Sequence, residues 1–74
     1  MRKSFRVVIE QDEDGIFIAR VPELPGCVSD GKTKDEALKN ITEAIEGYME
    51  TMRAEGWPLP KVVGEETITV DVKA

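Results

Sequence analysis

Residues 34–55 place the strongest limit on how this chain of 74 residues can fold, because they have the pattern of one long amphipathic helix. Their apolar residues occupy one arc of about 140°, at ~100° per residue. These residues are Ala37, Leu38, Ile41, Ala44, Ile45, Tyr48, Met49 and Met52. Thr33 and Glu36 form a capping box before the helix, and Gly56 with Pro58 ends it. One helix of this length can cover only one face of a sheet.

The rest of the sequence predicts strands. Residues 4–10 alternate apolar and polar side chains as a half-buried strand does, and residues 16–21 are rich in β-branched and aromatic residues. Residues 12–15, Asp-Glu-Asp-Gly, form a tight-turn sequence, so we expect the two strands to pair as an antiparallel hairpin. Residues 27–30 can form a short third strand, and residues 67–72 alternate again as a fourth.

Together these elements predict a single α+β domain over residues 1–74, with the element order β-β-β-α-β. The first three strands should form an antiparallel meander. A right-handed crossover through the helix then returns the last strand beside the first, which gives a four-stranded mixed sheet of order 3-2-1-4. The helix covers one face of this sheet, since a chain this short has room for one hydrophobic layer.

The face without a helix is where we expect a partner to bind. The second strand has apolar residues on both sides, because Ile16 and Ile18 alternate with Phe17 and Ala19, and the sequence leaves open which side faces outward. Val8 breaks the alternation of the first strand in the same way. We therefore name Val8, Ile16 and Ile18 as a possible interface patch, since an exposed apolar patch usually marks an interface. The alternative is a modest patch that needs no partner.

Charge indicates the class of partner. The chain has 15 acidic and 10 basic residues, a net charge of -5, whereas binding a phosphate backbone requires clustered Lys and Arg. A basic protein is the better electrostatic match. The candidate partner-binding residues are acids of the first third of the chain: Glu10, Asp12, Glu13, Asp14 and Glu23. A solvated acidic surface is the simpler interpretation, and it is compatible with a binding role.

Residues that could support catalysis are scarce. The chain has no histidine, and its one cysteine, Cys27, is expected to be buried as a small apolar residue. Residues 10–15 imitate half of a calcium loop, but position twelve is Val21 and cannot supply the required carboxylate. We predict no catalytic residue, metal or cofactor. The single cysteine and the lack of a signal or membrane-spanning pattern favour a soluble cytoplasmic protein.

One motif carries a family resemblance. Residues 22–27, Pro-Glu-Leu-Pro-Gly-Cys, together with Glu-Ala-Leu at residues 36–38, resemble the HicB antitoxin family of toxin–antitoxin systems, and the similarity runs over residues 4–55. That resemblance implies a partial ribonuclease-H-like fold without ribonuclease activity. It also implies a partner, HicA, a small basic mRNA interferase whose active site the antitoxin covers. Many members add a C-terminal DNA-binding module. No further helical pattern follows residue 55 here, so we expect no direct contact with nucleic acid.

Three functional hypotheses follow from these features. The leading one is a HicB-like domain that sequesters a small basic HicA-type toxin. The alternative is an orphan self-associating domain with a binding or regulatory role and no toxin partner. The third is a degenerate nuclease that uses metal-bound carboxylates. We also expect a homodimer or larger assembly, formed through the open face or through the exposed edge of the third or fourth strand.

Overall fold

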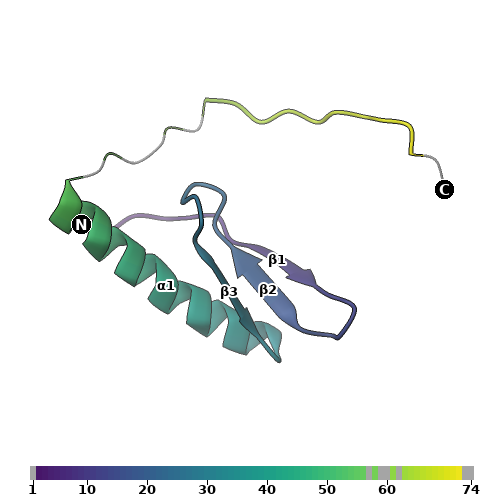
Figure 1. Cartoon of the computed structure of the whole chain (residues 1–74), viewed down its shortest axis with the longest axis horizontal. Helices are drawn as coiled ribbons and strands as arrows, with labels where there is room; N and C mark the ends of the chain where they lie inside the picture. The colour runs from purple at the N-terminus through teal and green to yellow at the C-terminus, as the bar shows by residue number, and fades with distance from the viewer. Residues whose placement is uncertain (1, 57, 59–60, 62, 73–74) are drawn as a thin grey trace.

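The computed structural model describes residues 2–56, 58, 61 and 63–72. It contains four elements, which are β1 (Val8–Gln11), β2 (Phe17–Arg20), β3 (Val28–Gly31) and α1 (Lys34–Glu55). The strands form one antiparallel sheet in the order β1-β2-β3, and α1 lies along one face of it (Figure 1). The α+β class, the meander and the bounds of the helix are confirmed, although β1 and β2 are shorter than the sequence predicted and β3 begins and ends one residue later.

The turn between β1 and β2 is built around one carboxylate. Asp12 Oδ1 accepts hydrogen bonds from the backbone amides of Asp14 and Ile16, both at 2.9 Å. Gly15 has a φ of 83°, in the left-handed region that glycine enters without a steric penalty. These contacts fix the hairpin, and through it the pairing of β1 with β2.

The helix is capped at both ends as its sequence predicts. Thr33 Oγ1 accepts a hydrogen bond from the backbone amide of Glu36 at 3.1 Å, and Glu36 Oε1 accepts one from the amide of Lys32 at 3.2 Å. Gly56 ends the helix with a φ of 69°, and its amide donates to the carbonyl of Met52. Capping of this kind satisfies backbone groups that a helix terminus leaves without partners.

The core lies between α1 and the β2–β3 half of the sheet. Its buried residues come from β2, from the loop that follows β2, and from the inner side of α1: Ala19, Val21, Leu24, Cys27, Ala37, Ile41 and Met52. Because α1 packs mainly on β3 and then on β2, β1 stays at the margin. Phe5, Val7 and Ile9 reach the core only partly buried. Leu38, which was expected on the apolar arc of the helix, is half-buried and lies outside this cluster.

The predicted fourth strand is wrong. Residues 63–72 run past the sheet as an extended segment without joining it, so the sheet of the described chain is neither four-stranded nor mixed, and the order 3-2-1-4 is absent (Figure 1). The side chains expected to enter the core are exposed instead: Ile68 by 81%, Val70 by 68% and Val72 by 84%. Alternation defines the two sides of a strand, but it does not specify which sheet edge the strand pairs with.

Candidate functional site

The sheet face turned away from α1, here called the outer face, carries interleaved apolar and charged side chains. Two neighbouring cross-strand rows make up this face: Val8, Arg20 and Val28 in one, and Glu10, Ile18 and Asp30 in the other. They alternate along their strands with residues such as Ile9 and Ala19, which pack into the core, so they project from the opposite side.

The outer face combines modest apolar area with paired charge. Val8 and Ile18 are half-buried, while Val28 is 55% exposed. Arg20 stands between the two valines and donates from Nε to Glu10 Oε1 at 3.1 Å. The face is therefore a broken apolar patch with a surface ion pair inside it, and such a pair contributes little to folding stability.

The three predicted patch residues do not all lie within these rows. Val8 and Ile18 are in them, whereas half-buried Ile16 precedes β2, close to the hairpin turn. Sequence reasoning missed Val28. The available signal was its neighbour, because a buried Cys27 requires that the next side chain of an extended segment point outward. A binding role for these residues remains a prediction.

Four of the five candidate acids lie together at the hairpin end of the sheet. Glu10 is engaged with Arg20, and Asp12 holds the turn. Glu13 and Asp14 are exposed at the hairpin tip. Among these four acids, Glu13 and Asp14 are therefore the two whose side chains make no hydrogen bond or ion pair within the described part of the chain.

The fifth candidate, Glu23, lies apart from the others. It follows β2 rather than preceding it, so it sits at the opposite end of that strand from the hairpin turn. Its Oε2 accepts a hydrogen bond from the backbone amide of Arg6 at 3.2 Å, and its Oε1 is buried without a partner in the described part of the chain. This carboxylate ties the N-terminal segment to the loop after β2, which is a structural task.

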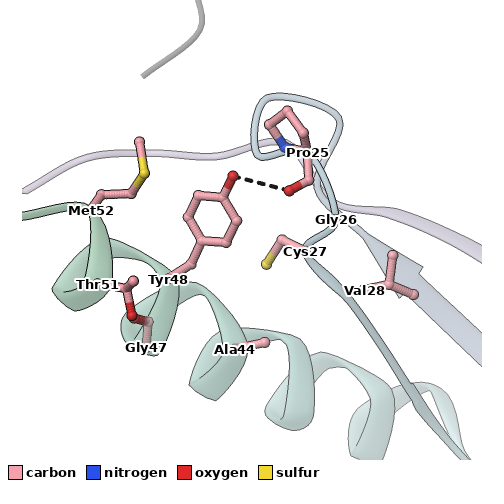
Figure 2. A pocket seen from close by; sticks show the side chains of 9 residues that line it. All are labelled: Pro25, Gly26, Cys27, Val28, Ala44, Gly47, Tyr48, Thr51 and Met52. Carbon is pink, nitrogen blue, oxygen red and sulfur yellow. Dashed lines mark hydrogen bonds between the residues drawn. The ribbon is translucent and has the colours of Figure 1, made fainter. Parts of the chain in front are cut away.

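The motif at residues 22–27 is a compact loop closed by its own backbone. The amide of Leu24 donates to the carbonyl of Val21 at 3.0 Å, and the amide of Cys27 donates to the carbonyl of Leu24 at 3.0 Å. Gly26 turns the chain with a φ of 81°. From α1, the hydroxyl of Tyr48 donates to the carbonyl of Pro25 at 3.0 Å, as Figure 2 shows. The loop is thereby fastened to the helix.

Beside this contact lies a pocket of about 410 Å³ between the loop and α1 (Figure 2). It is lined by nine residues, none of them charged: Pro25, Gly26, Cys27, Val28, Ala44, Gly47, Tyr48, Thr51 and Met52. Its walls suit an apolar group, and the ionisable groups in its lining are the Cys27 thiol and the Tyr48 hydroxyl, both neutral in their ordinary form. Val28, which helps to line the pocket, is also a residue of the outer face.

Burial raises the pKa of the Cys27 thiol, because desolvation disfavours the thiolate. Since the thiolate is the reactive form, we expect iodoacetamide at about pH 8 to alkylate Cys27 at least tenfold more slowly than a short unstructured peptide containing the same cysteine. Mass spectrometry over time measures both rates, and unfolding in urea should make them equal. A native rate equal to that of the peptide would show that Cys27 is accessible.

Among the residues that the structure describes, no three Cys, Asp or Glu side chains converge as a ligand set. Over the same residues, no helix combines the length and the apolar character required to cross a bilayer.

Comparison with known proteins places this architecture in a family. The model of the HicB-like antitoxin of bacterial toxin–antitoxin systems matches residues 5–71. The chain belongs to that family. A UPF0150 protein of Thermoplasma acidophilum is 48% identical over 67 residues, which are 90% of this chain and 96% of that protein. One of Helicobacter pylori is 58% identical over 48 residues, 65% of each protein.

A solved structure agrees with this assignment. The HicB-like chain is similar to the crystal structure of the N-terminal domain of the Burkholderia pseudomallei antitoxin HicB, with a TM-score of 0.68 and 33% identity over 82% of this chain and 72% of that one. Family membership indicates a role in a toxin–antitoxin system, and hence a toxin as partner.

Proposed function

We propose that this chain is a cytoplasmic antitoxin domain that binds a small basic toxin of the HicA type, an mRNA interferase, and covers its RNA-binding site without catalysing a reaction. The outer face carries this proposal. It is the side of the sheet that α1 leaves uncovered, and it presents Val8, Ile18 and Val28 next to carboxylates at the hairpin end.

Electrostatics support a cationic partner. An enzyme that cleaves RNA must offer positive charge to the phosphate backbone. The exposed carboxylates of Glu13 and Asp14 at the hairpin tip, with Asp30 on the outer face, can meet that charge. Complementary charge of this kind accelerates association and selects the partner, while the apolar side chains supply area to bury.

Charge reversal at the hairpin tip tests the proposal. We expect the double substitution Glu13→Lys and Asp14→Lys to weaken binding of a co-expressed HicA-type toxin about tenfold or more, because two attractive contacts become repulsive. Both side chains are exposed and make no hydrogen bond or ion pair in the described part of the chain, so the double variant should still fold. Calorimetric titration measures the affinity, and relief of growth arrest measures protection.

The matched control is Glu43→Lys with Glu55→Lys, which makes the same change in net charge at exposed positions of α1. It should bind the toxin within about twofold of the wild type. Failure of the wild-type chain to bind or to relieve toxicity would refute the proposal. Equal weakening by both double variants would mean that overall charge, and not the hairpin end, governs binding.

A further inference from the structure

The two edges of the sheet are not equivalent. At the β3 edge, Asn40 Nδ2 donates to the carbonyl of Asp30 at 2.8 Å, and α1 packs closely against that strand. At the other edge, β1 has no strand beside it in the described chain. The β1 edge therefore keeps a row of backbone donors and acceptors available for a further strand.

A groove lies between the N-terminal segment that leads into β1 and the C-terminal half of α1. It has a volume of about 630 Å³, and it combines the apolar side chains of Phe5, Ile45 and Met49 with the charged side chains of Lys3, Glu46, Glu50 and Arg53. The three apolar side chains are only partly buried. A strand added beside β1 would direct every second side chain to the α1 side of the sheet, which is the side where this groove lies.

The same chain carries a segment suited to fill it. In residues 67–72, Ile68, Val70 and Val72 alternate with Thr69 and other polar residues, so one side of the segment is apolar. All three apolar side chains are largely exposed. The segment is extended, has one apolar side and is not paired with a sheet. Unpaired segments of this kind can add as a strand to the open sheet edge of another chain.

Charge also favours contact between the two regions. The N-terminal segment carries Arg2, Lys3 and Arg6 without an acid, whereas the end of the chain carries Glu65 and further acids at 66 and 71. Arg6 and Glu65 already form an ion pair where the segment passes the start of β1. Beyond that pair the segment runs past its own sheet without pairing with it (Figure 1).

We propose that residues 67–72 pair with the β1 edge of a second copy of this chain, and that the second copy returns the same contact. Ile68, Val70 and Val72 then occupy the partner's groove over Phe5 and Met49. Each copy has both an open sheet edge and an unpaired segment that can fill such an edge. Two copies related by a two-fold axis can therefore each pair their segment with the other's β1 edge. The result is a dimer that leaves the outer face of each copy free.

Light scattering on the full chain tests the exchange through one substitution and its control. The wild type should be a dimer, and Val70→Asp should weaken dimerisation about tenfold or more, because the shorter polar side chain loses the apolar contact with Phe5 and Met49 and its carboxylate loses hydration. Val63→Asp is the control, since Val63 is 92% exposed and lies outside the alternating stretch. It should stay dimeric. A wild type that is monomeric at every concentration, or a Val70→Asp variant that dimerises normally, would overturn the proposal.

Mixed isotope labelling of the wild type tests the same contact without a substitution. Protein with ¹³C-labelled methyl groups is mixed with unlabelled protein, and filtered NOE spectra then report contacts between copies. We expect NOEs from the Ile68 methyl groups to the Phe5 ring between differently labelled copies. NOEs only within one copy would overturn the exchange. Neither experiment involves a toxin, so this result is separate from the proposed antitoxin function.

Discussion

Alanine at Gly31 is expected to lower the free energy of unfolding by about 3 kcal/mol, which is a large share of the stability of a domain of this size. A Cβ atom there would lie 2.5 Å from the backbone nitrogen of Ala37 and 2.9 Å from the carbonyl carbon of Glu36. Both are backbone atoms in the first turn of α1, so no side-chain rotation relieves the clash. To accept the methyl group, β3 must move away from the helix that it packs against most closely.

Urea unfolding followed by circular dichroism measures this loss, and a second glycine provides the control. Gly47 lies within α1, and a Cβ atom added there meets nothing within 4 Å. Because glycine weakens a helix interior, Gly47→Ala should raise the free energy of unfolding by about 0.5–1 kcal/mol. If Gly31→Ala unfolds at the same urea concentration as the wild type, then β3 and α1 leave room at Gly31 for a methyl group.

The elements that the sequence predicted best are those with strong local signals. The helix begins and ends where Thr33 and Gly56 place its caps, and the first hairpin forms where Asp12 and Gly15 permit a tight turn. Each signal acts within about five residues, so it needs no knowledge of the rest of the fold. The importance of Gly31 was not visible in the same way, because its cause is a helix that packs against β3.

The features that the sequence could not predict depend on contacts between segments that are distant in the chain. Alternation over residues 67–72 defines one apolar side, but it cannot show whether that side meets this sheet or another molecule. The candidate acids were grouped by their closeness in sequence, yet β2 separates Glu23 from the hairpin tip. The strand pairing is what places Val28 in the same cross-strand row as Val8.

Alanine at Leu24 is expected to cost about 3 kcal/mol of unfolding free energy. Leu24 is only 1% exposed and is one of the two largest fully buried side chains among the described residues. Its backbone is held at both the amide and the carbonyl by the hydrogen bonds of the loop at residues 22–27. The loop therefore cannot collapse into the cavity that the smaller side chain leaves. Urea unfolding measures the loss.

Leu38→Ala is the matched control for Leu24→Ala, since it makes the same change at a half-buried helix position outside the core cluster. It should cost less than about 1.5 kcal/mol, because alanine favours the helix and little packing is lost. The comparison decides what the Pro-Glu-Leu-Pro-Gly-Cys motif does. If Leu24→Ala keeps wild-type stability but loses toxin binding, the motif is a recognition site. The expected loss of stability would instead show that the motif is structural, because Leu24 closes the core next to β2.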